Sequence, residues 1–339
     1  MKKIVPGVDY YQVVFTIPSE LSALTLGNRR AMFNLLFQAA WKSLKKVLEN
    51  EQQYEAAASM VLHTWNQHLD AHVHVHAVVP GGGPSLTSAN TWKNAEPPPH
   101  ERSTRPWLVE ADDLRTEFRT QFLHGLRQLR AKGELKLEGD WSHLQNAAAF
   151  ETFLHPIETT SWVTYIQPPP TDSSEPADIV KYLARYLTGG PISDGRLVAC
   201  NGRCVTFTAR TGTVHGGNSE TEEVKLPAVE FVRRWCLHIL PKGFTKTRCY
   251  GGYSNHHCQR YVAECRDLLR GTDDATNQLP EREHGDEHSD TKETPGRRCP
   301  TCGSELELLK REHRTSWRDV FSFDSESRPP WYRSWETSG

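Results

Sequence analysis

The 339-residue sequence contains no apolar run near 18 residues, and its start, Met1-Lys2-Lys3, is followed by no hydrophobic signal region. A membrane-spanning helix needs about 20 consecutive apolar residues, and a secretory signal needs an apolar stretch behind its basic start. The chain is therefore predicted to be neither membrane-spanning nor secreted. Its length predicts a sizeable core in one large or two modest domains.

A dense cysteine framework is also absent, because the eight cysteines are scattered along the chain. We therefore expect reduced thiols in the cytoplasm. One pair, Cys299 and Cys302, has the spacing of half a zinc knuckle. A tetrahedral Zn²⁺ site needs two more ligands, and there is no second Cys-x-x-Cys. Two interpretations stay open: His313 or an upstream cysteine completes a zinc site, or the pair binds no metal.

Excess positive charge is missing as well, since the formal net charge is −2. Residues 271–295 contain eight acids and two bases and so carry −6, which leaves +4 on the remaining residues. A mildly basic body is compatible with phosphate contacts, although many solvated surfaces look the same. The acidic stretch is poor in hydrophobic residues and is predicted to be a disordered linker. It would divide a domain of residues 1–270 from a C-terminal tail of residues 296–339.

A histidine-rich strand is predicted at residues 72–79, followed by Pro80-Gly81-Gly82-Gly83. Alternate side chains of a strand share a face, so His72, His74 and His76 project together. Neutral imidazoles two residues apart on a rigid strand can hold a divalent cation. The glycine run is expected to leave backbone open to a phosphate chain. A histidine-rich edge strand without a metal is the alternative.

A pair of tyrosines, Tyr182 and Tyr186, lies in residues 177–187, which are predicted to form a helix that stops at Gly189-Gly190. Residues four apart are neighbours on a helical face. A phenol with a pKa of about 10 is a poor nucleophile at neutral pH unless a metal polarises the phosphate that it attacks. Paired aromatics at this spacing usually belong to a core, but together with the histidines they suit covalent DNA cleavage.

The rest of the sequence predicts strands and helices in mixed order. Strands are expected at residues 10–18, 56–65 and 161–167, and the stretch 84–106 reads as a proline-rich loop. Helices are expected at residues 28–51, 110–132, 144–154 and 228–239. The turn Asn201-Gly202 predicts a hairpin of residues 197–200 and 205–209.

Taken together, these stretches resemble the two-tyrosine HUH rolling-circle transposases of the bacterial insertion-sequence-91 family. The resemblance covers residues 10–270 in family order. Its motifs are YQVVFTIP at 11–18, LHTW at 62–65, HVHVHAVVPGGG at 72–83, WVTY at 162–165, YLARY at 182–186, RLV at 196–198, FVRR at 231–234, HILPKGF at 238–244 and CYG at 249–251.

The resemblance implies an α+β fold, in which an antiparallel-sheet nuclease core carries the metal histidines on a central strand and the tyrosine helix packs against it. His74 and His76 would bind Mg²⁺ or Mn²⁺, with His72 accessory and a third ligand among Gln67, His68 and Asp70. Tyr182 or Tyr186 would attack single-stranded DNA at element ends and target sites, forming a 5′-phosphotyrosine. A cytoplasmic, nucleoid-associated bacterial protein is expected.

Candidate DNA-binding residues cluster in residues 242–261, the most basic and aromatic-rich part of the chain. Bases can stack on such rings while cations bind phosphates, although ordinary folding would use the same residues. The candidates there are Lys242, Lys246, Arg248 and Tyr250, and Arg185, between the two tyrosines, is a further candidate.

The chain departs from the resemblance at its start, because members usually carry a cysteine-rich zinc module ahead of the strand at residues 10–18. Target choice is therefore in doubt. Three alternatives remain open: a degenerate remnant that binds DNA without cutting it, a plasmid replication initiator with the same chemistry, and a zinc-dependent hydrolase that uses the three histidines and leaves no protein–DNA link.

Overall fold

The computed structural model describes residue 5 and residues 7–98, 107–169, 189–211 and 220–274. All of these belong to the first of the two units of the chain, Met1–Gln278. The predicted tyrosine helix, the pair Cys299 and Cys302, and the acidic linker from residue 275 onward lie outside the described residues. Residues 271–274, which were assigned to that linker, are the last turn of a helix.

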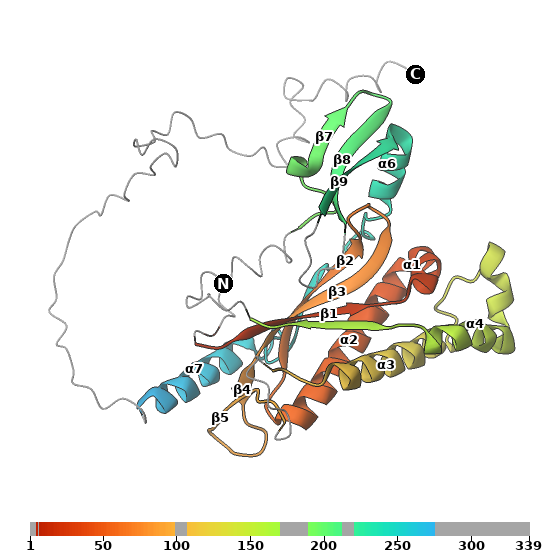
Figure 1. The fold of residues 1–339 in the computed structure, drawn as a ribbon. Coiled ribbons are helices and arrows are strands. Elements are labelled where there is room, and N and C mark those ends of the chain that lie inside the picture. Colours follow the sequence, from red (N-terminus) through yellow and green to blue (C-terminus); the bar gives the residue numbers. More distant parts are fainter. Residues whose placement is uncertain (1–4, 6, 99–106, 170–188, 212–219, 275–339) are drawn as a thin grey trace, which may run out of the picture. The chain divides into compact units, whose positions relative to one another are not determined.

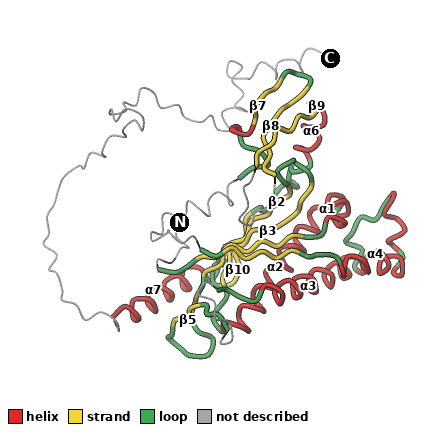
Figure 2. Tube along the Cα trace, in the orientation of Figure 1, coloured by secondary structure: helices red, strands yellow, loops and turns green. Residues whose placement is uncertain are grey.

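Five antiparallel strands form the sheet that carries the histidines, here called the central sheet (Figures 1 and 2). Their order is β10 (Thr247–Gly251), β2 (Ala57–Trp65), β3 (Ala71–Pro80), β1 (Tyr10–Thr16) and β6 (Val163–Gln167). The histidine strand β3 is the middle strand, paired with β2 on one side and β1 on the other. The predicted α+β class with an antiparallel sheet is confirmed, and so is the central place of the histidine strand.

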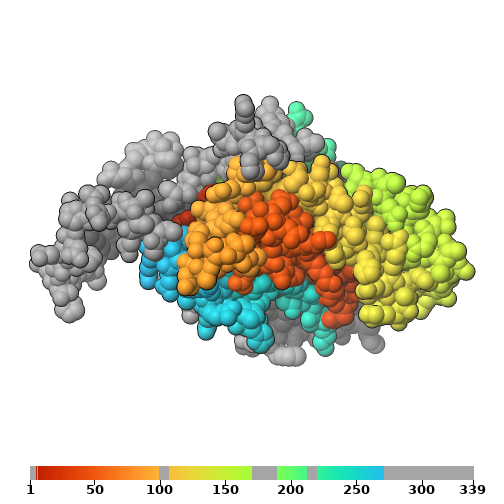
Figure 3. Space-filling model, turned by 90° about the horizontal axis from the view of Figure 1, so that it is seen from below, coloured from red at the N-terminus to blue at the C-terminus, as the bar shows by residue number. Residues whose placement is uncertain are grey.

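One face of the central sheet is apolar and is covered by helices. Val13 and Phe15 of β1 and Val75 of β3 have no exposed surface, because strand alternation turns them all to this side. The covering helices are α2 (Arg29–Gln52) and α3 (Ala111–Ala131). Phe15 meets Phe118 of α3 edge to face, with ring centroids 5.1 Å apart. In Figure 3 the α2 segment, red-orange, lies beside the α3 segment, yellow.

The bounds of the covering helices agree with the sequence patterns. The apolar stripe of α2 is buried along its length, and the helix ends where Gln53 adopts a left-handed conformation with φ 57°. Helix α3 begins after Glu110, whose carboxylate caps the backbone N–H of Asp112. The shorter elements nearby are η1 (Ser19–Leu21), α1 (Ser22–Gly27), η2 (Gly139–Gln145) and α4 (Ala147–Thr159).

The opposite face is divided between an apolar end and the histidine end. At the apolar end, helix α7 (Cys258–Asp274) contributes Tyr261 to a cluster with Tyr10, Val78 and Tyr253. At the other end this face presents polar side chains of β1, β2 and β3, and these include the histidines. The sheet therefore places the histidines on the side away from its main core.

The glycine run after β3 corrects the expectation of open backbone. Residues 82–84 form strand β4 (Gly82–Pro84), which pairs with β5 (Trp92–Asn94) inside the predicted proline-rich loop. All three glycines are buried. A Cβ atom on Gly82 would lie 2.7 Å from the Trp92 ring and 2.8 Å from the Lys93 carbonyl oxygen. The glycines are needed for close packing, and they leave no room for a phosphate chain.

A second antiparallel sheet, here called the small sheet, follows in the chain (Figure 1). It consists of β7 (Leu197–Cys200), β8 (Cys204–Thr211) and β9 (Glu220–Pro227), preceded by η3 (Asp194–Arg196) and followed by helix α6 (Ala228–Cys236). The predicted hairpin is confirmed, since β7 pairs with β8 across a turn in which Gly202 has φ 80°. That positive φ is why the turn requires glycine.

Candidate metal centre

Three imidazoles converge on the polar face of the central sheet. His63 comes from β2, and His74 and His76 come from β3. One nitrogen from each ring can be chosen so that all three lie within 4.8 Å of one another. Ring centroids are 5.4 Å apart for His63 and His74, 4.5 Å for His63 and His76, and 4.8 Å for His74 and His76. This spacing suits a shared divalent cation.

A shift in strand register brings His63 to this face. Trp65 pairs with Ala71, but His63 pairs with His74, so one residue of β3 is passed over between the two pairs. Without the shift His63 would lie opposite Val73, whose side chain belongs to the apolar core. Bulges of this kind re-aim side chains and are common beside functional sites. The irregularity is therefore what completes the histidine group.

The three histidines are nearly buried, with 8–9% of each residue exposed. Burial holds the pKa of His74 well below its ordinary value of 6.5, and the neighbouring histidines add to this effect. Burial likewise lowers the pKa of His76 to about 3, with further contributions from His63, His72 and Lys246. His74 and His76 are therefore neutral at pH 7, as a metal ligand must be.

The tautomer of His74 is fixed by its own strand. Its Nδ1 lies 2.8 Å from the carbonyl oxygen of His72. A carbonyl oxygen only accepts, so Nδ1 carries the proton and donates it, which leaves the lone pair on Nε2. A ligand histidine that donates its other ring N–H to a backbone carbonyl is the usual arrangement in metal sites. His74 is thus oriented to bind an ion through Nε2.

The other ligand candidates from the sequence lie outside this group. The His72 ring centroid is 5.0 Å from that of His74, but the residue is exposed and does not join the three. Gln67 is exposed in the β2–β3 turn, where its carbonyl accepts a hydrogen bond from Arg196. The roles of His72 and Gln67 stay predictions. Sequence reasoning missed His63, although Leu62-His63-Thr64-Trp65 was among the motifs that carried the resemblance.

An aromatic ring and one cation flank the histidines. Trp65 stacks on His63 with ring centroids 4.7 Å apart and an interplanar angle of 20°. The ammonium of Lys246 lies 5.1 Å from the Trp65 ring centroid and donates to the Gly189 carbonyl at 2.7 Å. Burial lowers the pKa of Lys246 below its ordinary value. A desolvated positive charge beside the histidines favours an anionic ligand such as a phosphate.

The other predicted DNA contacts are dispersed. Arg248 packs its guanidinium over the rings of Phe37 and Phe244, at 4.4 and 4.9 Å, and Tyr250 stacks on Trp41 at 5.3 Å. Their strand partners in β2 are Met60 and Ala58, which belong to the apolar core. Both side chains therefore face away from the histidines and serve packing in this structure. Lys242 is exposed, and Arg185 lies outside the described residues.

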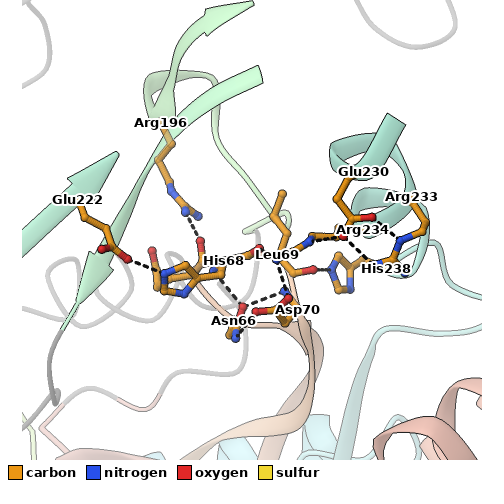
Figure 4. A network of polar contacts seen from close by, with 11 residues as sticks. Asn66, His68, Leu69, Asp70, Arg196, Glu222, Glu230, Arg233, Arg234 and His238 are labelled. Atoms are coloured by element: carbon orange, nitrogen blue, oxygen red, sulfur yellow. Dashed lines mark hydrogen bonds and ion pairs between the residues drawn. The ribbon is translucent and has the colours of Figure 1, made fainter. Parts of the chain in front are cut away.

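The turn between β2 and β3 is held by a polar network (Figure 4). Within the turn, the Asn66 side chain accepts from the backbone N–H groups of His68 and Asp70, both at 2.9 Å. Helix α6 contributes Arg234, which pairs with Asp70 at 2.7 Å and donates to the His68 carbonyl at 3.1 Å. These contacts link the turn to the part of the chain that follows the small sheet.

Three further contacts lie in this region, and Figure 4 shows those at Leu69 and Glu222. His238 donates from Nε2 to the Leu69 carbonyl at 3.0 Å, so its Nδ1 accepts from the Thr64 hydroxyl at 3.2 Å. His68 meets Glu222 of β9 at 2.7 Å. His238 thereby links Thr64, which follows His63 in β2, to Leu69 in the β2–β3 turn. Sequence reasoning assigned no role to His238.

No helix among the described residues is both long and apolar enough to cross a membrane.

Comparison with known proteins places the chain among transposases. A family profile described as "Putative transposase" matches residues 58–260, a region that contains the three histidines and both tyrosines. The chain is 31% identical over 334 residues to the putative transposase y4qJ of Sinorhizobium fredii, an alignment that covers 97% of this chain and 77% of that protein.

A second relative is the transposase for insertion sequence element IS801 of Pseudomonas savastanoi pv. phaseolicola. It is 27% identical over 269 residues, which cover 78% of this chain and 59% of the relative. No solved structure gives a significant match.

Proposed function

The chain belongs to the transposase family whose profile it matches, and from this premise we propose that it cleaves and rejoins single-stranded DNA at the ends of an insertion sequence through a tyrosine–DNA link. The observation that carries the proposal is the group of His63, His74 and His76 on two neighbouring strands. The order of histidines before tyrosines also agrees with a rolling-circle nuclease core.

The histidines fit a divalent cation by the chemistry of their donor atoms. Their nitrogens are close together and nearly buried, burial keeps His74 and His76 neutral, and His74 already presents Nε2. An all-nitrogen set suits Mn²⁺ better than Mg²⁺, which prefers oxygen ligands. An ion held there would act as a Lewis acid on the scissile phosphate. We propose His63 as the third ligand in place of Gln67.

Tyr182 and Tyr186 are the proposed nucleophiles, although both lie outside the described residues. The phenolic oxygen would attack the phosphorus, and the bond from phosphorus to the 3′ oxygen would break. The leaving oxygen takes a proton to become a 3′-hydroxyl, while the 5′-phosphate stays on the tyrosine. One phosphodiester replaces another, so rejoining needs no ATP. A second tyrosine allows a second cleavage before the first link is resolved.

A contact near the histidines supports this assignment. Gly189 directly follows the undescribed stretch and closes the helix predicted at residues 177–187. Its carbonyl accepts from Lys246, whose ammonium lies over the ring of Trp65, and Trp65 stacks on His63. Gly189, which follows the predicted tyrosine helix in the sequence, therefore lies close to the metal centre. We propose Lys246 as the residue that contacts the phosphate there, and Lys242 and Arg185 as further DNA contacts.

A cleavage assay tests the proposal. The protein is mixed with Mn²⁺ and end-labelled single-stranded DNA from the flanks of its own gene, and the products are separated on a denaturing gel. We expect label that migrates with the protein. The adduct should persist in Tyr182→Phe and in Tyr186→Phe but disappear in the double variant and in His74→Ala.

Other outcomes would identify the competing functions. DNA that is bound in a native gel but never linked to the protein would indicate an inactive remnant. Released product without an adduct would indicate a zinc-dependent hydrolase. The three histidines also favour this alternative, because sets of three histidines hold catalytic Zn²⁺. Adduct formation only on DNA from a replication origin would indicate a plasmid initiator.

A further inference from the structure

Gln12 lies beside the metal centre and has no role in the proposed chemistry. It belongs to β1, where Val14 pairs with His76, so Gln12 is two residues away on the same face of the sheet. It is 2% exposed, and its amide nitrogen lies 2.6 Å from Nδ1 of His76. Its neighbours Val13 and Phe15 face the apolar core. A buried amide placed against a ligand candidate needs an explanation.

The contact couples the orientation of the Gln12 amide to the tautomer of His76. An amide nitrogen can only donate, so in this orientation Nδ1 accepts and the neutral ring carries its proton on Nε2. A protonated Nε2 cannot bind an ion. His74 is in the opposite state, because its Nδ1 donates to a carbonyl and its Nε2 is free. With the amide in this orientation, the two histidines of β3 have different tautomers.

We propose that Gln12 is a positioning residue that sets the tautomer of His76 and so controls loading of the site, an inference that rests on the proposed metal centre. A rotation of the amide by 180° presents its carbonyl oxygen to Nδ1–H and frees Nε2. The two ends of an amide have nearly the same size, so the rotation preserves packing. In the rotated state the carbonyl oxygen of Gln12 accepts a hydrogen bond from Nδ1–H of His76. The carbonyl oxygen of His72 accepts from Nδ1–H of His74 in the same way.

Mn²⁺ binding to the full-length, EDTA-stripped protein tests the proposal, followed by electron paramagnetic resonance of the free ion. Gln12→Met keeps the volume but removes both polar ends, and we expect it to bind Mn²⁺ about 10- to 100-fold more weakly than Gln12→Glu. Gln12→Glu offers an oxygen that accepts from Nδ1–H, so affinity should equal or exceed that of wild type. Equal affinity in Gln12→Met and Gln12→Glu would overturn the proposal.

A second measurement needs neither ion nor activity. Nitrogen NMR of protein labelled with ¹⁵N-histidine distinguishes Nδ1–H from Nε2–H, and His76→Ala identifies the signals. We expect His76 to be protonated on Nε2 in the ion-free wild type and on Nδ1 in Gln12→Glu. A purely structural role of Gln12 would leave the tautomer unchanged, and that result would overturn the inference.

The two measurements also separate this inference from the proposed function. If the His76 tautomer follows residue 12 but wild type binds no Mn²⁺, the metal centre itself fails, and the role of Gln12 in loading fails with it. If wild type binds Mn²⁺ and the tautomer ignores residue 12, only the inference about Gln12 is wrong.

Discussion

The central sheet and the small sheet place their apolar residues differently. Behind the histidines, Phe15 and Val75 have no exposed surface. In the small sheet and α6, by contrast, Val198 is 50% exposed and Val229 is 83% exposed. The central sheet packs against two long helices, whereas the small sheet and α6 reach the β2–β3 turn through ion pairs and hydrogen bonds such as Arg234 to Asp70.

The difference indicates where the geometry of the site is determined. Burying a large apolar side chain contributes about 1.5–3 kcal/mol, while an exposed ion pair contributes about 0–1 kcal/mol. The histidines project from strands whose other face is fixed by the core. The polar network at the β2–β3 turn contributes much less to stability than the apolar core does. Four predictions test this contrast, in order of decreasing effect.

The largest effect is expected in the core. Phe15→Ala should reduce the free energy of unfolding by about 3–5 kcal/mol, because it removes a fully buried ring that contacts Phe118. Urea unfolding followed by circular dichroism measures the change. The matched control, Val229→Ala in α6, should change stability by less than about 0.5 kcal/mol. Similar losses in both variants would remove the distinction between the two regions.

Removal of a ligand should be next in size. His63→Ala should weaken Mn²⁺ binding by about 100-fold or more, because it removes one of the three nitrogens proposed to bind the ion. Loss of a residue that only orients a ligand costs about 10- to 100-fold. Calorimetric titration of the full-length protein measures the affinity. His72→Ala is the control, because His72 lies on the same face but outside the group. If His72→Ala lost affinity and His63→Ala did not, the ligand set read from the sequence would replace the one read from the structure.

Acid should destabilise the central sheet through the buried histidines. The pKa of His76 is about 3 in the folded state, below its ordinary 6.5, so the stability that it contributes is present above pH 6.5 and is lost as the pH falls towards 3. Between these values only the unfolded chain takes up the proton. One such group lowers stability by about 2 kcal/mol at pH 5.

The comparison of urea midpoints at pH 7.5 and 5.0 tests this effect, with EDTA present. His76→Gln should lose less stability on acidification than wild type does. Equal pH sensitivity in the two proteins would mean that His76 is already protonated in the fold, or that other groups dominate.

The smallest effect is expected at the turn. Arg234→Met removes the ion pair to Asp70 and should cost about 0.2–1 kcal/mol, reduced further by salt. Urea midpoints at low and high NaCl measure it, and Mn²⁺ affinity should change little. A loss of affinity as large as that of His63→Ala would show that the network positions the histidines, and the contrast between the regions would need revision.

The alternation of residues 10–18 and 72–79 was sufficient to predict strands β1 and β3 and the shared face of His74 and His76, because side-chain direction in a strand depends only on local geometry. The helix at residues 28–51 was predictable for the same reason, from the spacing of its apolar stripe. The motifs also led to the transposase family without any tertiary information.

Only the tertiary structure decided which residues complete the site. His63 reaches His74 through a one-residue register shift, and no local pattern specifies where a strand passes over a residue of its partner. Arg248 and Tyr250 look like DNA contacts in the sequence, yet pairing of β10 with β2 turns them towards the core. Gln12 meets His76 although 64 positions separate them, because pairing between distant strands is set by the whole sheet and not by either segment alone.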